Sequence, residues 1–131
     1  MTARTASCSC GQLKVICTGE PIRVSMCHCL NCQRRTGSLF AVTSRWSDDQ
    51  VTFEGRANEY VLAGDEGSKA TFRFCPTCSA TVYFTNDQMP GMIAVPVGAF
   101  ADPTFPPPVV SVYGVRRHPW VTHTLVIEEM D

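Results

Sequence analysis

Seven of the eight cysteines in this chain of 131 residues fall into three tight clusters. The clusters are Cys8-Ser9-Cys10, the triplet Cys27, Cys29 and Cys32, and Cys75-Pro76-Thr77-Cys78. Cysteines separated by one or two residues are poorly placed for disulfides with each other but well placed to bind one ion together. Zinc is the metal expected for thiolate ligands, with an iron–sulfur cluster as the alternative. The pattern therefore predicts a metal-binding protein.

The length and composition predict one ordinary globular domain over residues 1–131. A formal net charge of -1 argues against a nucleic-acid-binding surface. The start of the chain lacks the apolar run of a signal peptide, and no segment reaches membrane-spanning length. We therefore expect a cytoplasmic protein with reduced thiols and no membrane or nucleic-acid partner. The oligomeric state is left open.

Short strands alternate with Gly and Pro along the whole chain, which predicts an all-β domain of packed antiparallel sheets. One short helical turn is expected over Asn31–Gly37. The expected strands are Gln12–Cys17, Ile22–Cys27, Ser38–Arg45, Val51–Glu54, Glu59–Ala63, Lys69–Phe74, Ala80–Thr85, Met92–Val97 and Val109–Tyr113.

The first and third cysteine clusters suit a single four-thiolate site. Residues i and i+2 of a strand project to the same face, so Cys8 and Cys10 can reach one ion. Cys75 and Cys78 form a Cys-x-x-Cys knuckle, in which a tight turn brings both sulfurs to one metal. Such a site would tie the amino-terminal strand to the middle of the chain, and its binding free energy would become folding free energy.

The middle cluster offers three thiolates and leaves the fourth zinc position open to water or a thiol. His28 lies between two of the ligands, and strand alternation points its side chain away from the metal. We expect an orienting or packing role for His28, with the fourth ligand or a proton acceptor as the alternative. Cys17 lies outside every cluster and is expected to be a small buried hydrophobic residue.

The spacing also allows a second division of the cysteines between metal sites. Cys75 and Cys78 could join two of the middle cysteines in a zinc ribbon, which would leave Cys8 and Cys10 free. That arrangement would describe a zinc-stabilised binding module without catalysis.

The three clusters, together with the residues around them, resemble the glutathione-dependent formaldehyde-activating enzymes, a grouping that includes the centromere protein V domain. The resemblance rests on Ser7-Cys8-Ser9-Cys10-Gly11, on Cys27-His28-Cys29-Leu30-Asn31-Cys32-Gln33-Arg34-Arg35-Thr36-Gly37-Ser38, on Phe74-Cys75-Pro76-Thr77-Cys78, and on the closing Tyr113-Gly114-Val115-Arg116-Arg117-His118-Pro119-Trp120. Two departures stand out. The family usually has Gly where this chain has Ser79, and often His where this chain has Val112.

The resemblance implies an all-β fold of the Mss4-like type with two zinc ions per chain. Cys8, Cys10, Cys75 and Cys78 would hold a structural zinc. The catalytic site would be Cys27, Cys29 and Cys32, holding the second zinc. The family's named reaction adds glutathione to formaldehyde to give S-hydroxymethylglutathione, a carbon–sulfur lyase reaction in reverse.

If this reaction carries over, the partners are a small-molecule thiol such as glutathione and a small aldehyde. Arginine suits the two carboxylates of glutathione, so Arg34 and Arg35, which follow the triplet, are the expected substrate-binding residues. The alternative for at least one of them is a solvated surface position or a counter-charge to the anionic zinc site. No Asp or Glu lies beside the triplet, and the proton donor stays unassigned. Two other functions compete with the enzyme: a zinc-stabilised binding module, and thiol redox chemistry at the triplet.

Overall fold

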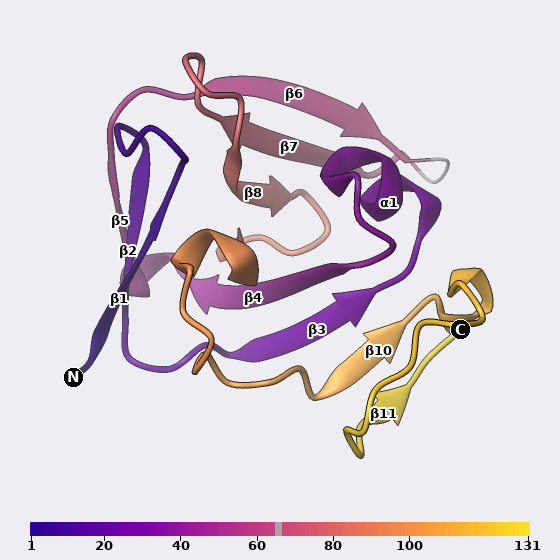
Figure 1. Ribbon diagram of the computed structural model, residues 1–131. Coiled ribbons are helices and arrows are strands. Elements are labelled where there is room, and N and C mark those ends of the chain that lie inside the picture. Colours follow the sequence, from indigo (N-terminus) through magenta and orange to yellow (C-terminus); the bar gives the residue numbers. More distant parts are fainter. Residues whose placement is uncertain (65–66) are drawn as a thin grey trace.

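Two β-sheets make up the computed structural model, which describes residues 1–64 and 67–131 (Figure 1). The smaller sheet has the order β1 (Ala3–Ser7), β2 (Lys14–Thr18) and β5 (Val51–Glu54). The larger sheet has eight strands, in the order β11 (Glu128–Glu129), β10 (Val110–Val112), β3 (Arg23–Cys27), β4 (Ala41–Ser47), β9 (Met92–Pro96), β8 (Thr81–Asn86), β7 (Lys69–Phe74) and β6 (Asn58–Ala63). The amino terminus lies at the small sheet and the carboxyl terminus at the far edge of the large one (Figure 1).

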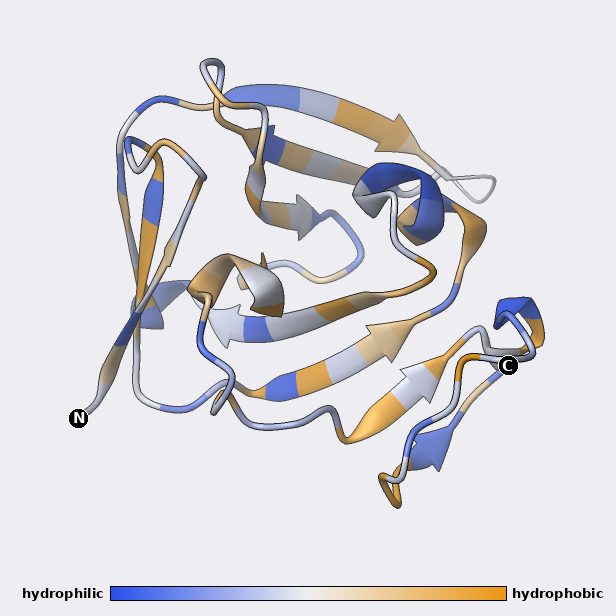
Figure 2. Cartoon of the chain, in the orientation of Figure 1, coloured by the Kyte–Doolittle hydropathy of each residue, from blue (hydrophilic) through white to orange (hydrophobic). Residues whose placement is uncertain are grey.

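Helices are short. The α-helix α1 (Leu30–Thr36) follows β3, and the 3-10 helices are η1 (Asp48–Gln50), η2 (Val97–Phe100) and η3 (Gly114–Arg116). The residues of α1 are mainly hydrophilic, in contrast to the apolar stretches along the strands (Figure 2). In residues 1–64 and 67–131, every helix is too short to span a bilayer.

The predicted all-β class with little helix is confirmed. Strand β1 is not among the expected strand ranges, because Ala6 is its only buried side chain and its sequence gives little apolar alternation. Cys8 and Cys10, expected on an extended strand, lie instead in the turn that follows β1. Strand β10 pairs in parallel with both β3 and β11, whereas the other strand pairs described are antiparallel. The proline-containing connection between η2 and β10 gives the chain the length that a parallel crossover needs.

The hydrophobic core lies between the small sheet and one face of the large sheet. Val15 from β2 and Val24 and Val95 from the large sheet belong to it, together with Trp46, which is fully buried. The Trp46 indole Nε1 donates to Ser44 Oγ at 2.9 Å, and this hydroxyl donates to the Val95 carbonyl oxygen at 2.8 Å. The polar atoms of the Trp46 and Ser44 side chains are thus paired within the core.

Gly55, which follows β5, allows a close approach between two turns of the chain. Its φ is +93°, and a Cβ atom there would lie 1.9 Å from the Gln12 carbonyl oxygen. The Gln12 side chain makes two hydrogen bonds to the backbone of Arg56, the residue after Gly55. Its Oε1 accepts from the Arg56 amide at 2.9 Å, and its Nε2 donates to the Arg56 carbonyl at 2.7 Å.

Replacing Gly55 should therefore be unusually destabilising. Gly55→Ala combines left-handed strain with a backbone clash, and we expect it to lower the free energy of unfolding by about 3 kcal/mol or more. Gly91→Ala is the matched control, because Gly91 has φ +76° but nothing within 4 Å of the added Cβ. It should cost only about 1–2 kcal/mol. Denaturant unfolding of both variants measures the difference, and equal losses would show that the close approach to Gln12 contributes nothing.

Candidate metal centres

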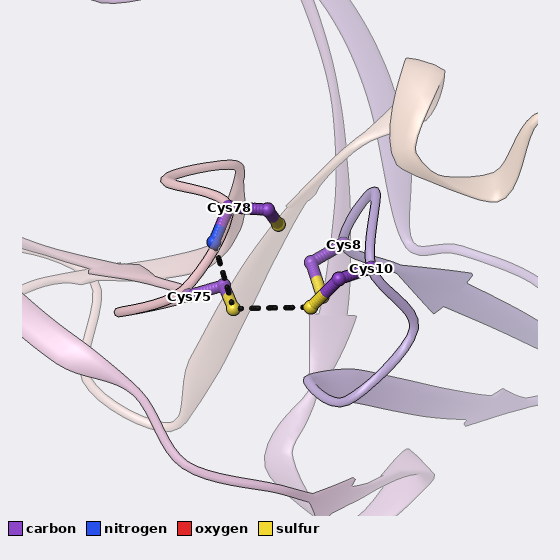
Figure 3. A group of neighbouring side chains, drawn as sticks. All are labelled: Cys8, Cys10, Cys75 and Cys78. Carbon is purple, nitrogen blue, oxygen red and sulfur yellow. Dashed lines mark hydrogen bonds between the residues drawn. The ribbon is translucent and has the colours of Figure 1, made fainter.

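Four cysteine sulfurs converge where the small sheet meets the large one. Cys8 and Cys10 lie in the turn between β1 and β2, and Cys75 and Cys78 lie in the turn between β7 and β8 (Figure 3). Their Sγ atoms lie within 4.8 Å of one another, with Cys8–Cys10 and Cys10–Cys75 distances of 3.6 Å. Tetrahedral zinc with sulfur ligands at about 2.3 Å requires sulfurs about 3.8 Å apart. The group therefore fits a four-thiolate zinc ion.

Nitrogen donors surround these sulfurs. The Leu13 amide donates to Cys8 Sγ at 3.3 Å, and the Thr77 amide donates to Cys75 Sγ at 3.3 Å. The Gln12 Nε2, which also holds Arg56, donates to Cys75 Sγ at 3.0 Å. Burial opposes ionisation of Cys75, but the hydrogen bonds from Gln12 and two backbone amides lower its pKa to about 5. Cys75 is thus prepared to be a thiolate, the form that binds metal.

The triplet lies at the junction of β3 and α1. Cys27 ends the strand, Cys29 is the N-cap of the helix, and Cys32 lies in its first turn. The three Sγ atoms lie within 4.8 Å of one another, and each residue is only half-buried. The Cys32 amide donates to Cys29 Sγ at 3.3 Å. Hydrogen bonds from the Cys27 and Cys32 side chains lower the pKa of Cys29, and the same bond with Cys29 raises the pKa of Cys27.

His28 points away from the triplet and packs inside the protein, as strand alternation predicts. Its side chain is fully buried, and its ring centroid lies 5.7 Å from that of Phe40. Neither ring nitrogen has a hydrogen-bond partner among the described residues, and burial lowers the pKa of the imidazole. Its backbone amide donates to the Val112 carbonyl at 3.1 Å, so the residue fixes β3 against β10.

Gln33 holds α1 in place over the carboxy-terminal segment. Its Nε2 donates to the His28 carbonyl at 2.9 Å and to the Arg116 carbonyl at 3.3 Å. Its Oε1 lies 3.0 Å from His118 Nε2. The residue beside the third cysteine therefore links the triplet to the closing segment of the chain.

Two cavities adjoin the triplet. The first, here called the arginine cavity, has a volume of about 280 Å³ and is lined by Cys27, Cys32, Arg23, Arg35, Arg45 and Val112, among others. The second, here called the apolar cavity, has a volume of about 350 Å³ and is lined by Cys32, Arg34, Arg35, Tyr60, Leu62 and Phe72, among others. Cys32, Arg35 and Phe72 line both, so Cys32 is accessible from two sides.

Arg34 and Arg35, the arginines singled out in the sequence, are both brought to these cavities. Arg34 is exposed at the rim of the apolar cavity. Arg35 is half-buried, and its guanidinium lies over the rings of Phe72 at 4.9 Å and Phe84 at 5.0 Å. Stacking on two aromatic rings holds its charge between the two cavities.

Sequence reasoning missed Gln12, Arg23 and Arg45. Arg23 shares a face of β3 with Cys27, and this signal was present in the strand alternation. Arg45 could not be found in this way, because its place depends on which strand pairs with β3. Cys17 is buried in the core as expected, where burial raises its pKa to about 12.

The sequence model of the glutathione-dependent formaldehyde-activating enzyme family matches residues 3–116. The chain belongs to this family. A crystal structure of a Rhodobacter sphaeroides protein is similar in fold, with a TM-score of 0.54, 19% sequence identity, and coverage of 72% of this chain and 85% of that protein. No curated protein sequence matches the chain.

Ser79 and Val112, the two departures from the usual pattern of the formaldehyde-activating family, lie beside the two cysteine groups. Ser79 adopts φ 70°, a left-handed conformation that glycine takes without strain, and its amide donates to the Cys75 carbonyl at 2.8 Å. The knuckle therefore keeps its turn with serine. Val112 lies beside Cys27 in the strand register and lines the arginine cavity. The change from histidine makes this wall of the cavity apolar.

Proposed function

We propose that this protein is a zinc-dependent enzyme of the carbon–sulfur lyase type that joins a glutathione-type thiol to a small aldehyde. The observation that carries the proposal is the open geometry of the triplet. Three half-buried cysteines bring their sulfurs together there, His28 is buried away from them, and two cavities adjoin the triplet, one lined by Cys27 and Cys32 and the other by Cys32. The matching family, whose description names glutathione and formaldehyde, supports this substrate class.

The two cysteine groups take different roles in this proposal. The four sulfurs of Cys8, Cys10, Cys75 and Cys78 complete a tetrahedron and hold a structural zinc. Cys27, Cys29 and Cys32 hold the second zinc with one position left for a thiol, which suits a thiol-handling site. Free thiols in both groups are consistent with the reducing cytoplasm as the location.

The reaction forms one carbon–sulfur bond. The sulfur electron pair of the thiolate attacks the aldehyde carbon, and the aldehyde oxygen takes up a proton, so that thiol and aldehyde give a hydroxyalkyl thioether. Zinc, when bound, lowers the pKa of a thiol so that the thiolate is present at neutral pH.

The chain's own residues position the reactants. The triplet fixes the place of the sulfur, and Arg35 brings a positive charge to both cavities beside it. Among the described lining residues of the arginine cavity, Ser25, Thr43 and Tyr113 carry hydroxyl groups that can relay a proton to the aldehyde oxygen.

Metal content tests the division of roles. We expect two zinc ions per wild-type chain, and one in Cys29→Ser with the fold retained, because the triplet lies on a single local segment. Cys78→Ser should lose most of its folded structure, because the four-sulfur group joins two distant parts of the chain. Elemental analysis and far-ultraviolet circular dichroism measure both properties. One zinc in the wild type, or unfolding of Cys29→Ser, would contradict the division.

Activity tests the reaction itself. Carbon-13 exchange NMR on labelled formaldehyde and glutathione measures interconversion with the adduct. We expect Cys29→Ser to reduce the catalysed rate by on the order of a hundredfold or more, because the metal contributes several kcal/mol to such reactions. Cys17→Ala is the matched control, since it removes a buried thiol outside both groups. Equal rates for wild type and Cys29→Ser would leave a non-catalytic zinc module as the better account.

A further inference from the structure

We propose that the arginine cavity is a carboxylate-binding site built around Arg23 and Arg45, so that the thiol accepted at the triplet must be an anion. The inference rests on the proposed function only for the place of the thiol sulfur. The site itself lies on the face of the large sheet that bears Cys27.

Arg23 and Arg45 lie directly opposite each other on neighbouring strands. They are Cα partners in the antiparallel pairing of β3 and β4, and both line the arginine cavity. Like charges at directly opposed positions of a sheet destabilise the pairing. An anion placed between the two guanidinium groups would turn this repulsion into attraction.

Neither arginine has a carboxylate partner in the described part of the chain. The two arginine–carboxylate ion pairs found there join Arg4 to Glu20 and Arg73 to Glu59. The Arg45 Nε is closed off from solvent and has no hydrogen-bond partner among the described residues. A buried guanidinium donor without a partner is costly, and it points to a ligand that supplies the acceptor.

The position of the cavity fits a substrate that also reaches the triplet. Arg23, Ser25 and Cys27 alternate along one face of β3, so the arginine pair and the first sulfur share a surface. Arg35 and Cys32 close the cavity from α1. Among the described residues, no aspartate or glutamate lines it.

The positive charge of the arginines that line the cavity is larger than the negative charge of a zinc–thiolate group at the triplet. Zinc with three thiolates carries a formal charge of about -1, which one arginine can balance. Three arginines line the cavity, which leaves positive charge for the substrate. A planar carboxylate accepts two parallel hydrogen bonds from a guanidinium, whereas an uncharged thiol offers no such acceptor.

Binding of S-methylglutathione to the zinc-loaded protein tests the proposal. This probe keeps both carboxylates but has no free thiol, so it reports on the cavity without metal ligation or turnover. Calorimetry should show binding that weakens with salt, and the diethyl ester of the probe should bind on the order of tenfold more weakly or worse. Arg45→Met, which keeps the apolar stem, should weaken binding of S-methylglutathione on the order of tenfold to a hundredfold.

Arg23→Met provides a second variant at an exposed position, where loss of the fold is not expected, and it should also weaken binding. Arg56→Met is the matched control, because Arg56 is exposed and lies outside both cavities. Zinc content and circular dichroism are measured for every variant.

Three results would overturn the carboxylate site: absence of binding in the wild type, equal affinity for the ester, or unchanged affinity in the folded Arg23→Met and Arg45→Met variants. Loss of zinc from Arg45→Met without loss of probe affinity would likewise show that the arginine only balances the thiolates. Probe binding without turnover would contradict the proposed function while supporting this site. Turnover of glutathione and its diethyl ester at equal rates would support the proposed function and contradict the carboxylate site.

Discussion

The fold depends on the approach of Cys8 and Cys10 to Cys75 and Cys78. Cys10 and Cys75 are 65 residues apart in the chain, yet their sulfurs lie 3.6 Å from each other. A metal ion held by these four sulfurs would close a long loop and link the turn of the small sheet to the turn between β7 and β8. Closing a long loop constrains the unfolded chain, so metal binding at this group would stabilise the arrangement of the two sheets. The triplet differs, because its three cysteines follow one another from β3 into α1 and join no distant segments.

Strand alternation places the core residues of the large sheet on one face and the residues of the candidate site on the other. Val24 on β3 and Trp46 on β4 point into the core against the small sheet. Arg23 and Cys27, and Arg45 beside them on β4, point to the other face, where the cavities lie. Because the core occupies only one face, the other can carry half-buried thiols and unpaired positive charge. The energetic cost of these unpaired groups is tolerated because the hydrophobic core and the four-sulfur group, which stabilise the fold, lie elsewhere.

The sequence contains enough to predict much of this molecule. Cysteine spacing predicted metal binding but allowed two divisions of the cysteines, and the family resemblance selected the division that the structure shows. Strand alternation correctly predicted that His28 points away from the triplet, and Arg34 and Arg35 do reach the cavities. The missed features depend on long-range pairing. Strand β1 is held by its partner β2 rather than by its own apolar pattern, and Arg45 meets Arg23 only through the register of β3 with β4. Gln12 contacts Cys75 because Gly55 lets two distant turns approach, which no local pattern predicts.

The proposed function requires that the triplet leave one metal position for the substrate thiol. X-ray absorption at the zinc edge counts the sulfur ligands directly in the fully zinc-loaded protein. We expect an average between three and four sulfurs per zinc, rising to four when glutathione is added, with no rise in Cys29→Ser reconstituted under the same conditions. An average of four sulfurs before addition, or no change on adding glutathione to the wild type, would contradict the proposed function.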